Sequence, residues 1–498
     1  MKTIPQPGRV SPDASGTPSD GVAVTPPRST GVSRSDGIFS ASPSAPASLA
    51  KPPAHHSPQT RFSPLARAIQ LHSLFWLVAA NLVGLLLAAE LLWPALGDAL
   101  APFTYGRWMP LHLDWQLYGW CSLPLVGALF AWFTPHSFHS SFDLRPSDFS
   151  PPLVTGHWSL VIPTRSAQSA LWFWSTALAL GGVSWLTGET SGKLFLDWHG
   201  WARPLLPAAM SALWTVLAAL SWWHRSQFSR RGLLARAAFL LLLAAIPSVF
   251  YWSTGEKVYP SINPDSGGAT GSSLLGSTLG IIAIVGLLPS LLRISTINTR
   301  GSVHSVFWIF FVVSCAALAV IDHHHTSHHA AGQITGLTLL LGWIPLTWSY
   351  VRRFIWTSAT RPWLVAAFAW WTLLVITGLL TFLPGISEKL KFTHSLVAHA
   401  HLAMAGLVTS LHVAILNELR PTRPIRTGFV AWQIACALYV TAMLVLGSQE
   451  AFRADELFRS ELWTQALFTL RFLAGLAMTV VSIRWLAEAR RRDPAVAT

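Results

Sequence analysis

The chain has 498 residues, of which 52% are hydrophobic and only 11% are charged. A soluble protein has about 25% charged residues, so this composition excludes an ordinary soluble domain and indicates an integral membrane protein. The formal net charge of +13 does not indicate a nucleic-acid partner, because the placement of the arginines follows the alternation of the apolar segments, as membrane topology requires.

The N-terminal residues 1–62 are rich in Pro, Ser, Gly and Thr and contain no apolar core of the length that a signal peptide needs. Such a segment cannot bury enough apolar surface to fold, so we predict a disordered cytoplasmic tail. Residues 63–490 are expected to form one membrane domain, and residues 491–498 a short cytoplasmic C-terminal tail.

The membrane domain contains apolar stretches of the length that crosses a lipid bilayer. Lipid offers no partner to free backbone groups, so each stretch is expected to be a helix. The predicted fold class is therefore all-α, a polytopic bundle of twelve transmembrane helices. The stretches lie near residues 70–97, 110–133, 168–187, 204–223, 237–253, 273–292, 303–321, 331–351, 363–384, 395–415, 427–446 and 463–486.

The charged residues predict how these helices are oriented. Arginines gather after the even-numbered segments and acidic residues after the odd-numbered ones, which is the positive-inside pattern. Both termini are therefore expected in the cytoplasm. The arginines are Arg225, Arg230, Arg231, Arg236, Arg352, Arg353, Arg361, Arg420, Arg423, Arg426, Arg490, Arg491 and Arg492.

Histidines occur at the predicted outer ends of three segments. His112 lies near the start of the second segment, where a single histidine is more often structural than functional. The seventh segment is followed by His323, His324 and His325, and then by His328 and His329. This run is either a hydrated loop that binds divalent metals adventitiously or a specific metal site.

The start of the tenth segment lies within FTHSLVAHAHLAMAG, residues 392–406. A helix turns by about 100° per residue, so His399 and His401 point about 200° apart and cannot bind one metal ion together. Neutral imidazoles that face each other across a bundle are what axial ligation of haem iron requires. The sequence predicts one haem between His112 and one of this pair, and a second haem on the other.

Motifs along most of the membrane domain resemble the catalytic subunit I of haem-copper oxidases. The resemblance is closest to the cbb3-type cytochrome c oxidases, which are related to the nitric oxide reductases, and this family has twelve helices with both ends in the cytoplasm. The motifs are LAAELLWPAL in the first segment, YGRWMPLH before the second, SGKLFLDW before the fourth, the histidine run after the seventh, AHAHLAMAG in the tenth and LRFLAGL in the twelfth.

The resemblance implies cofactors for these histidines. His112 and His401 would be the axial ligands of a low-spin haem b, and His399 would hold a second, high-spin haem b. Two neighbours among His323, His324 and His325 would bind the copper ion that faces the second haem. Arg471 resembles an arginine in the last helix of the family.

The resemblance also implies an activity and partners. The chain would receive electrons from a cytochrome c or a similar donor, pass them from the low-spin to the high-spin haem, and reduce oxygen to water in aerobic respiration. It contains no Cys-x-x-Cys-His motif, so accessory membrane subunits would carry the c-type haem. The expected location is the inner (plasma) membrane of a bacterial cell.

The sequence departs from the family pattern at three places. No histidine occurs between His224 and His304, where the family has its third copper ligand, the seventh segment contains no tyrosine, and Met109 replaces an arginine. One alternative is a haem b electron-transfer or sensor protein without a complete copper centre. Others are an enzyme similar to the nitric oxide reductases, which would lack the same histidine, and a membrane transporter.

Overall fold

The computed structural model describes residues 64–135, 158–259, 265, 271–297, 302–321, 326–420, 426–453 and 461–491. The predicted N-terminal tail lies outside these residues. So do His323, His324 and His325, the predicted copper ligands. Residues 492–498 of the predicted C-terminal tail lie outside them as well.

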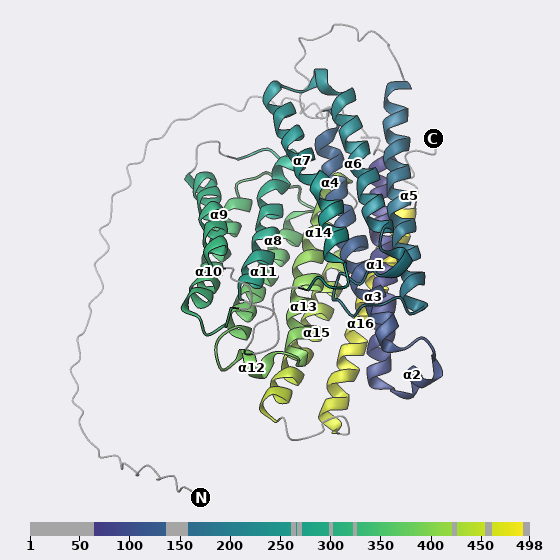
Figure 1. Cartoon of the computed structure of the whole chain (residues 1–498), viewed down its shortest axis with the longest axis vertical. Coiled ribbons are helices and arrows are strands. Elements are labelled where there is room, and N and C mark those ends of the chain that lie inside the picture. The colour runs from purple at the N-terminus through teal and green to yellow at the C-terminus, as the bar shows by residue number, and fades with distance from the viewer. Residues whose placement is uncertain are drawn as a thin grey trace, which may run out of the picture. The chain divides into compact units, whose positions relative to one another are not determined.

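Long helices make up most of the described chain, and in Figure 1 they run roughly antiparallel to one another. The described residues contain no β-strand, only an isolated bridge between Thr296 and Phe354, which confirms the all-α prediction for this part. The unbroken long helices are α1 (Pro64–Leu92), α5 (Trp158–Leu186), α6 (Leu205–Trp223), α7 (Arg230–Ser253), α8 (Gly271–Leu291), α9 (Ser302–Ile321), α10 (Ala331–Val351), α11 (Arg361–Thr381), α15 (Arg426–Phe452) and α16 (Leu462–Arg490).

Two further helical stretches are interrupted by a π-helical segment, which is a wider turn often found at functional sites. The first consists of α3 (Tyr105–Asp114), η1 (Trp115–Cys121) and α4 (Ser122–Phe133), and the second of α13 (His394–His401), η5 (Leu402–Val408) and α14 (Thr409–Leu419). The short helices α2 (Ala95–Ala99) and α12 (Ser387–Leu390) lie in connecting loops.

Ten helices of the described chain are long and apolar enough to cross a membrane, counting α13, η5 and α14 as one. This confirms a polytopic helical membrane protein. The other two expected spans correspond to α5 and to the stretch from α3 to α4, which are not among the ten. The count of twelve and the sidedness stay predictions.

Tryptophans from neighbouring helices hold both π-helical segments. The carbonyl of Tyr118 in η1 accepts a 2.8 Å hydrogen bond from Trp174 Nε1 on α5. The carbonyl of Ala405 in η5 accepts a 2.9 Å bond from Trp432 Nε1 on α15. A buried carbonyl that is displaced from the regular helix pattern needs another donor, and these indole groups supply it.

The start of α13 is fixed in three ways. The Thr393 side chain caps the helix by accepting from the Ser395 backbone N–H. Glu450 on α15 accepts a 2.8 Å bond from the His394 backbone N–H. Gly447 on α15 allows close approach, because an added Cβ there would overlap the Ser395 backbone. These contacts set the position of α13 relative to α15.

Candidate functional site

The structure brings His112 and His401 together from distant parts of the chain. His112 lies on α3, three residues before η1, and His401 is the last residue of α13, directly before η5. Their ring centres are 6.4 Å apart and the ring planes are inclined by 20°. The two π-helical segments therefore begin close to a pair of neighbouring imidazoles.

Backbone carbonyls fix the protonation of both rings. His112 Nδ1 lies 2.9 Å from the carbonyl oxygen of Ala80, and His401 Nδ1 lies 2.8 Å from that of Val397. A carbonyl only accepts hydrogen bonds, so each Nδ1 carries the hydrogen and a neutral ring has its lone pair on Nε2. Histidines that bind metals are usually oriented by such a bond at their other nitrogen.

The distance between the rings fits a metal ion held by both. A metal–imidazole bond of about 2 Å, with the ring centre about 1 Å beyond the nitrogen, puts two opposed ring centres about 6 Å apart. The observed 6.4 Å agrees with this value. The donor set of two neutral imidazoles also suits haem iron.

Gly84 on α1 provides the space that His112 occupies. A Cβ atom at this position would lie 2.6 Å from Cε1 and 2.7 Å from Nδ1 of His112. Real Cβ contacts are not this short, so any side chain at position 84 would displace the imidazole.

The variant Gly84→Ala is therefore expected to displace His112 and break its bond to Ala80. Loss of such an orienting contact lowers the affinity of a metal site by about 10–100-fold. If the pair holds the low-spin haem that the resemblance implies, the haem content of the purified protein measures the effect. Gly475→Ala is the matched control, because its Cβ would meet only Leu85 Cδ1 at 3.8 Å. Equal haem content in both variants would contradict the assigned role of Gly84.

His399 lies on another side of α13 and contacts α11. Its Nδ1 is 3.0 Å from Thr377 Oγ1, and this hydroxyl donates its hydrogen to the carbonyl of Leu373 at 2.8 Å. The hydroxyl oxygen therefore accepts from His399, which again leaves the lone pair on Nε2. His401 instead stacks on Tyr439 of α15, with ring centres 4.4 Å apart, so the two histidines face different neighbours as their spacing predicts.

Two other histidines of this region have structural roles. His412, which was not identified in the sequence, is buried, and both its nitrogens lie 2.6 Å from carbonyl oxygens, those of Val408 and Cys121. It connects α14 to η1 and offers no nitrogen to a ligand. His394 Nδ1 is 2.5 Å from Glu450. The His394 side chain therefore ties the start of α13 to α15.

A buried guanidinium lies close to the pair. Arg471 on α16 is 7% exposed, and its Nε donates a 2.9 Å bond to the hydroxyl of Tyr439, the residue that stacks on His401. Its Nη1 has no hydrogen-bond partner in the part of the chain that the structure describes. A buried cation with an unsatisfied donor favours an anionic group beside it.

No family model matches the chain, and no curated protein matches it. The resemblance to haem-copper oxidases therefore depends on the sequence motifs. Of the histidines it singles out, His112, His399 and His401 lie within the described residues.

Proposed function

We propose that the protein is a membrane haem b protein. His112 and His401 would be the axial ligands of a low-spin haem, and His399 would hold a second, high-spin haem. The observation that carries this proposal is the pair of imidazoles from separate helices, with ring centres 6.4 Å apart and each Nδ1 bonded to a backbone carbonyl.

The charge of the surroundings supports a haem rather than a bare metal ion. Haem b carries propionate carboxylates, and burying such an anion is costly unless a cation accompanies it. Arg471 is buried, has an unsatisfied Nη1 and contacts Tyr439 beside His401. It would supply the compensating charge.

The number of histidine ligands would decide the chemistry of each haem, and neighbouring residues would orient those histidines. Haem with histidine on both sides supplies one-electron transfer, and haem with one histidine offers an open position to a small molecule such as oxygen. The carbonyls of Ala80 and Val397 keep the proton of each ligand at Nδ1. Thr377 does the same for His399.

The reaction proposed first is oxygen reduction, as in a cbb3-like cytochrome c oxidase subunit I. Electrons would come from a cytochrome c through accessory subunits that carry c-type haem. In this version copper would bind to two of His323, His324 and His325.

A second candidate is a haem b electron-transfer or sensor protein. The absence of histidine between His224 and His304 favours it, because a complete copper site needs a third ligand. The absence of tyrosine from residues 303–321 points the same way. A reaction with nitric oxide would face the same missing ligand.

Cofactor analysis of the purified protein tests the proposal. Haem extraction is expected to give haem b at about two per chain, with one haem for each ligand set. A preparation that binds no haem after expression in a haem-sufficient host would contradict it. Copper analysis then separates the candidates: about one copper per chain supports the oxidase, and none supports the second candidate.

A further inference from the structure

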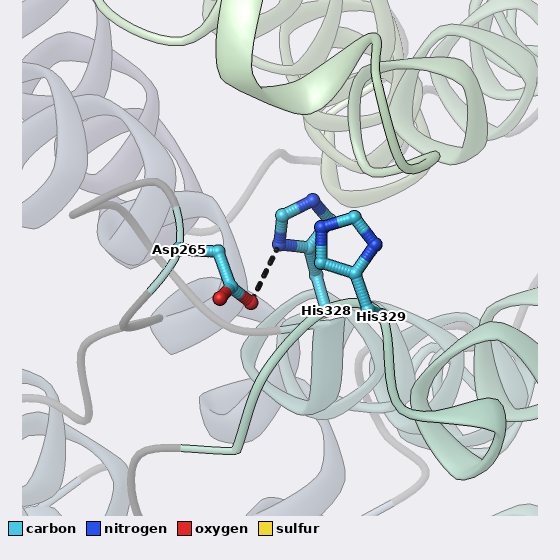
Figure 2. A group of neighbouring side chains, drawn as sticks. All are labelled: Asp265, His328 and His329. Carbon is cyan, nitrogen blue, oxygen red and sulfur yellow. Dashed lines mark ion pairs between the residues drawn. The ribbon is translucent and has the colours of Figure 1, made fainter. Parts of the chain in front are cut away.

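A second group of possible ligands lies outside the haem site, where three separate segments meet. Figure 2 shows Asp265, from the connection between α7 and α8, beside His328 and His329, which lie in the turn before α10. Glu388 on α12 contacts both histidines. Ligand atoms of Asp265 and the two histidines all lie within 4.8 Å of one another.

His328 is held between two carboxylates. Its side chain is fully buried, its Nδ1 lies 3.4 Å from Asp265 Oδ2 and its Nε2 lies 2.8 Å from Glu388 Oε1. Asp265 is itself held, because its Oδ2 accepts a hydrogen bond from Ser327 Oγ. The orientation of the buried imidazole is therefore determined from both ends.

His329 brings a second nitrogen to the same carboxylate oxygen. Its Nε2 lies 3.2 Å from Glu388 Oε1, and the ring centres of His328 and His329 are 4.3 Å apart. In a tetrahedral site with bonds of about 2 Å, neighbouring ligand atoms are about 3.3 Å apart. Both nitrogens lie at nearly this distance from the Glu388 oxygen.

We propose that His328, His329 and Glu388 bind a divalent metal ion of the zinc type, with Asp265 orienting His328. Two imidazoles and one glutamate form a known donor set for Zn²⁺, which leaves a fourth position for water or another ligand. A carboxylate on the far nitrogen of a ligating histidine is the usual supporting contact of such sites. The proposal does not depend on haem.

The alternative is a group of ion pairs in which His328 is a buried imidazolium between two carboxylates. This arrangement would satisfy the same distances without a metal ion. The metal site and the ion-pair cluster differ in whether they need His329. The His329 side chain is 53% exposed, and an exposed ion pair contributes little to stability. His329 is therefore the residue that separates the two.

Zinc binding to the purified full-length protein tests the proposal. The protein is stripped with a chelator, dialysed against Zn²⁺ and analysed for bound zinc. One tight zinc per chain is expected, and His329→Ala and Glu388→Gln should each weaken binding by at least about 100-fold, more than the 10–100-fold expected for Asp265→Asn. The exposed position of His329 makes its variant safe for folding, which thermal unfolding checks.

The triple variant His323→Ala, His324→Ala, His325→Ala is the control for the adjacent histidine run. It should keep the tight zinc. Loss of binding in the triple variant alone would place the metal in that run and overturn the proposal. Zinc binding that is absent at micromolar concentrations, or unchanged in His329→Ala and Glu388→Gln, would also overturn it and leave the ion pairs as the explanation of the cluster.

Discussion

Replacement of His401 by alanine is expected to remove the low-spin haem signal from the purified protein. The carbon monoxide response of the second haem should persist, and haem still held by His112 alone should add to it, because its sixth position is then open. His401 shares its candidate site with His112, at a ring-centre distance of 6.4 Å, whereas His399 contacts Thr377 on a different helix. Loss of one axial imidazole leaves the iron without its sixth ligand, so the low-spin state is lost. The same result is expected for His112→Ala. Optical spectra of the reduced protein measure it.

A rescue experiment separates ligation from a structural role. In His401→Gly the removed side chain leaves space for imidazole added in solution, which should restore a low-spin spectrum in proportion to its concentration. His394→Ala is the matched control on the same helix. It removes the side-chain bond to Glu450 but keeps the bond from the backbone N–H of residue 394 to Glu450, so the haem signals should be retained. An unchanged low-spin spectrum in His401→Ala would contradict the assignment.

Replacement of His399 by alanine is expected to have the complementary effect. The carbon monoxide difference spectrum should disappear, because the open haem loses its only protein ligand, while the low-spin signal persists. Thr377→Val keeps the shape of the side chain but removes the oxygen that accepts from His399 Nδ1 at 3.0 Å, and should weaken haem retention by about 10–100-fold.

The opposite outcome would exchange the roles assigned to His399 and His401. If His401→Ala abolished carbon monoxide binding and His399→Ala did not, then His399 would share the low-spin haem with His112. Expression, membrane insertion and thermal unfolding of each variant must match those of the parent protein, since a misfolded variant would lose both signals together.

The membrane class and the division between His399 and His401 could be predicted from sequence because each depends on a local property. Apolar length predicts a spanning helix, and a two-residue spacing puts side chains on different sides of a helix. The histidine spacing alone did not decide which of the two faces His112, although the resemblance implied His401. That depends on how α3 and α13 pack, and the structure places His401 there.

The supporting contacts could not be predicted because they have no signature in the sequence. Every residue has a carbonyl group, so nothing in the sequence distinguishes Ala80 or Val397 as the acceptors for the candidate ligands. The need for glycine at position 84 appears only once α1 packs against His112. Glu388 likewise meets His328 from a position 60 residues along the chain.

The π-helical segments were also missed. They lie inside stretches that were expected to be regular spanning helices, and one widened turn does not change the apolar pattern on which that expectation depends. In the stretch from α3 to α4, the polar residues Arg107, His112 and Asp114 lie near the start. Such residues lower the apolar character of a segment, and this stretch is not among the ten candidate spans.

The most direct test of the central claim is near-infrared magnetic circular dichroism of the oxidised protein, which distinguishes the axial ligands of low-spin haem. We expect the charge-transfer band of a haem with two histidine ligands, present in the parent protein and in His394→Ala and absent from both His112→Ala and His401→Ala. A spectrum without that band in the haem-loaded parent protein, or one that keeps it in either ligand variant, would contradict the account.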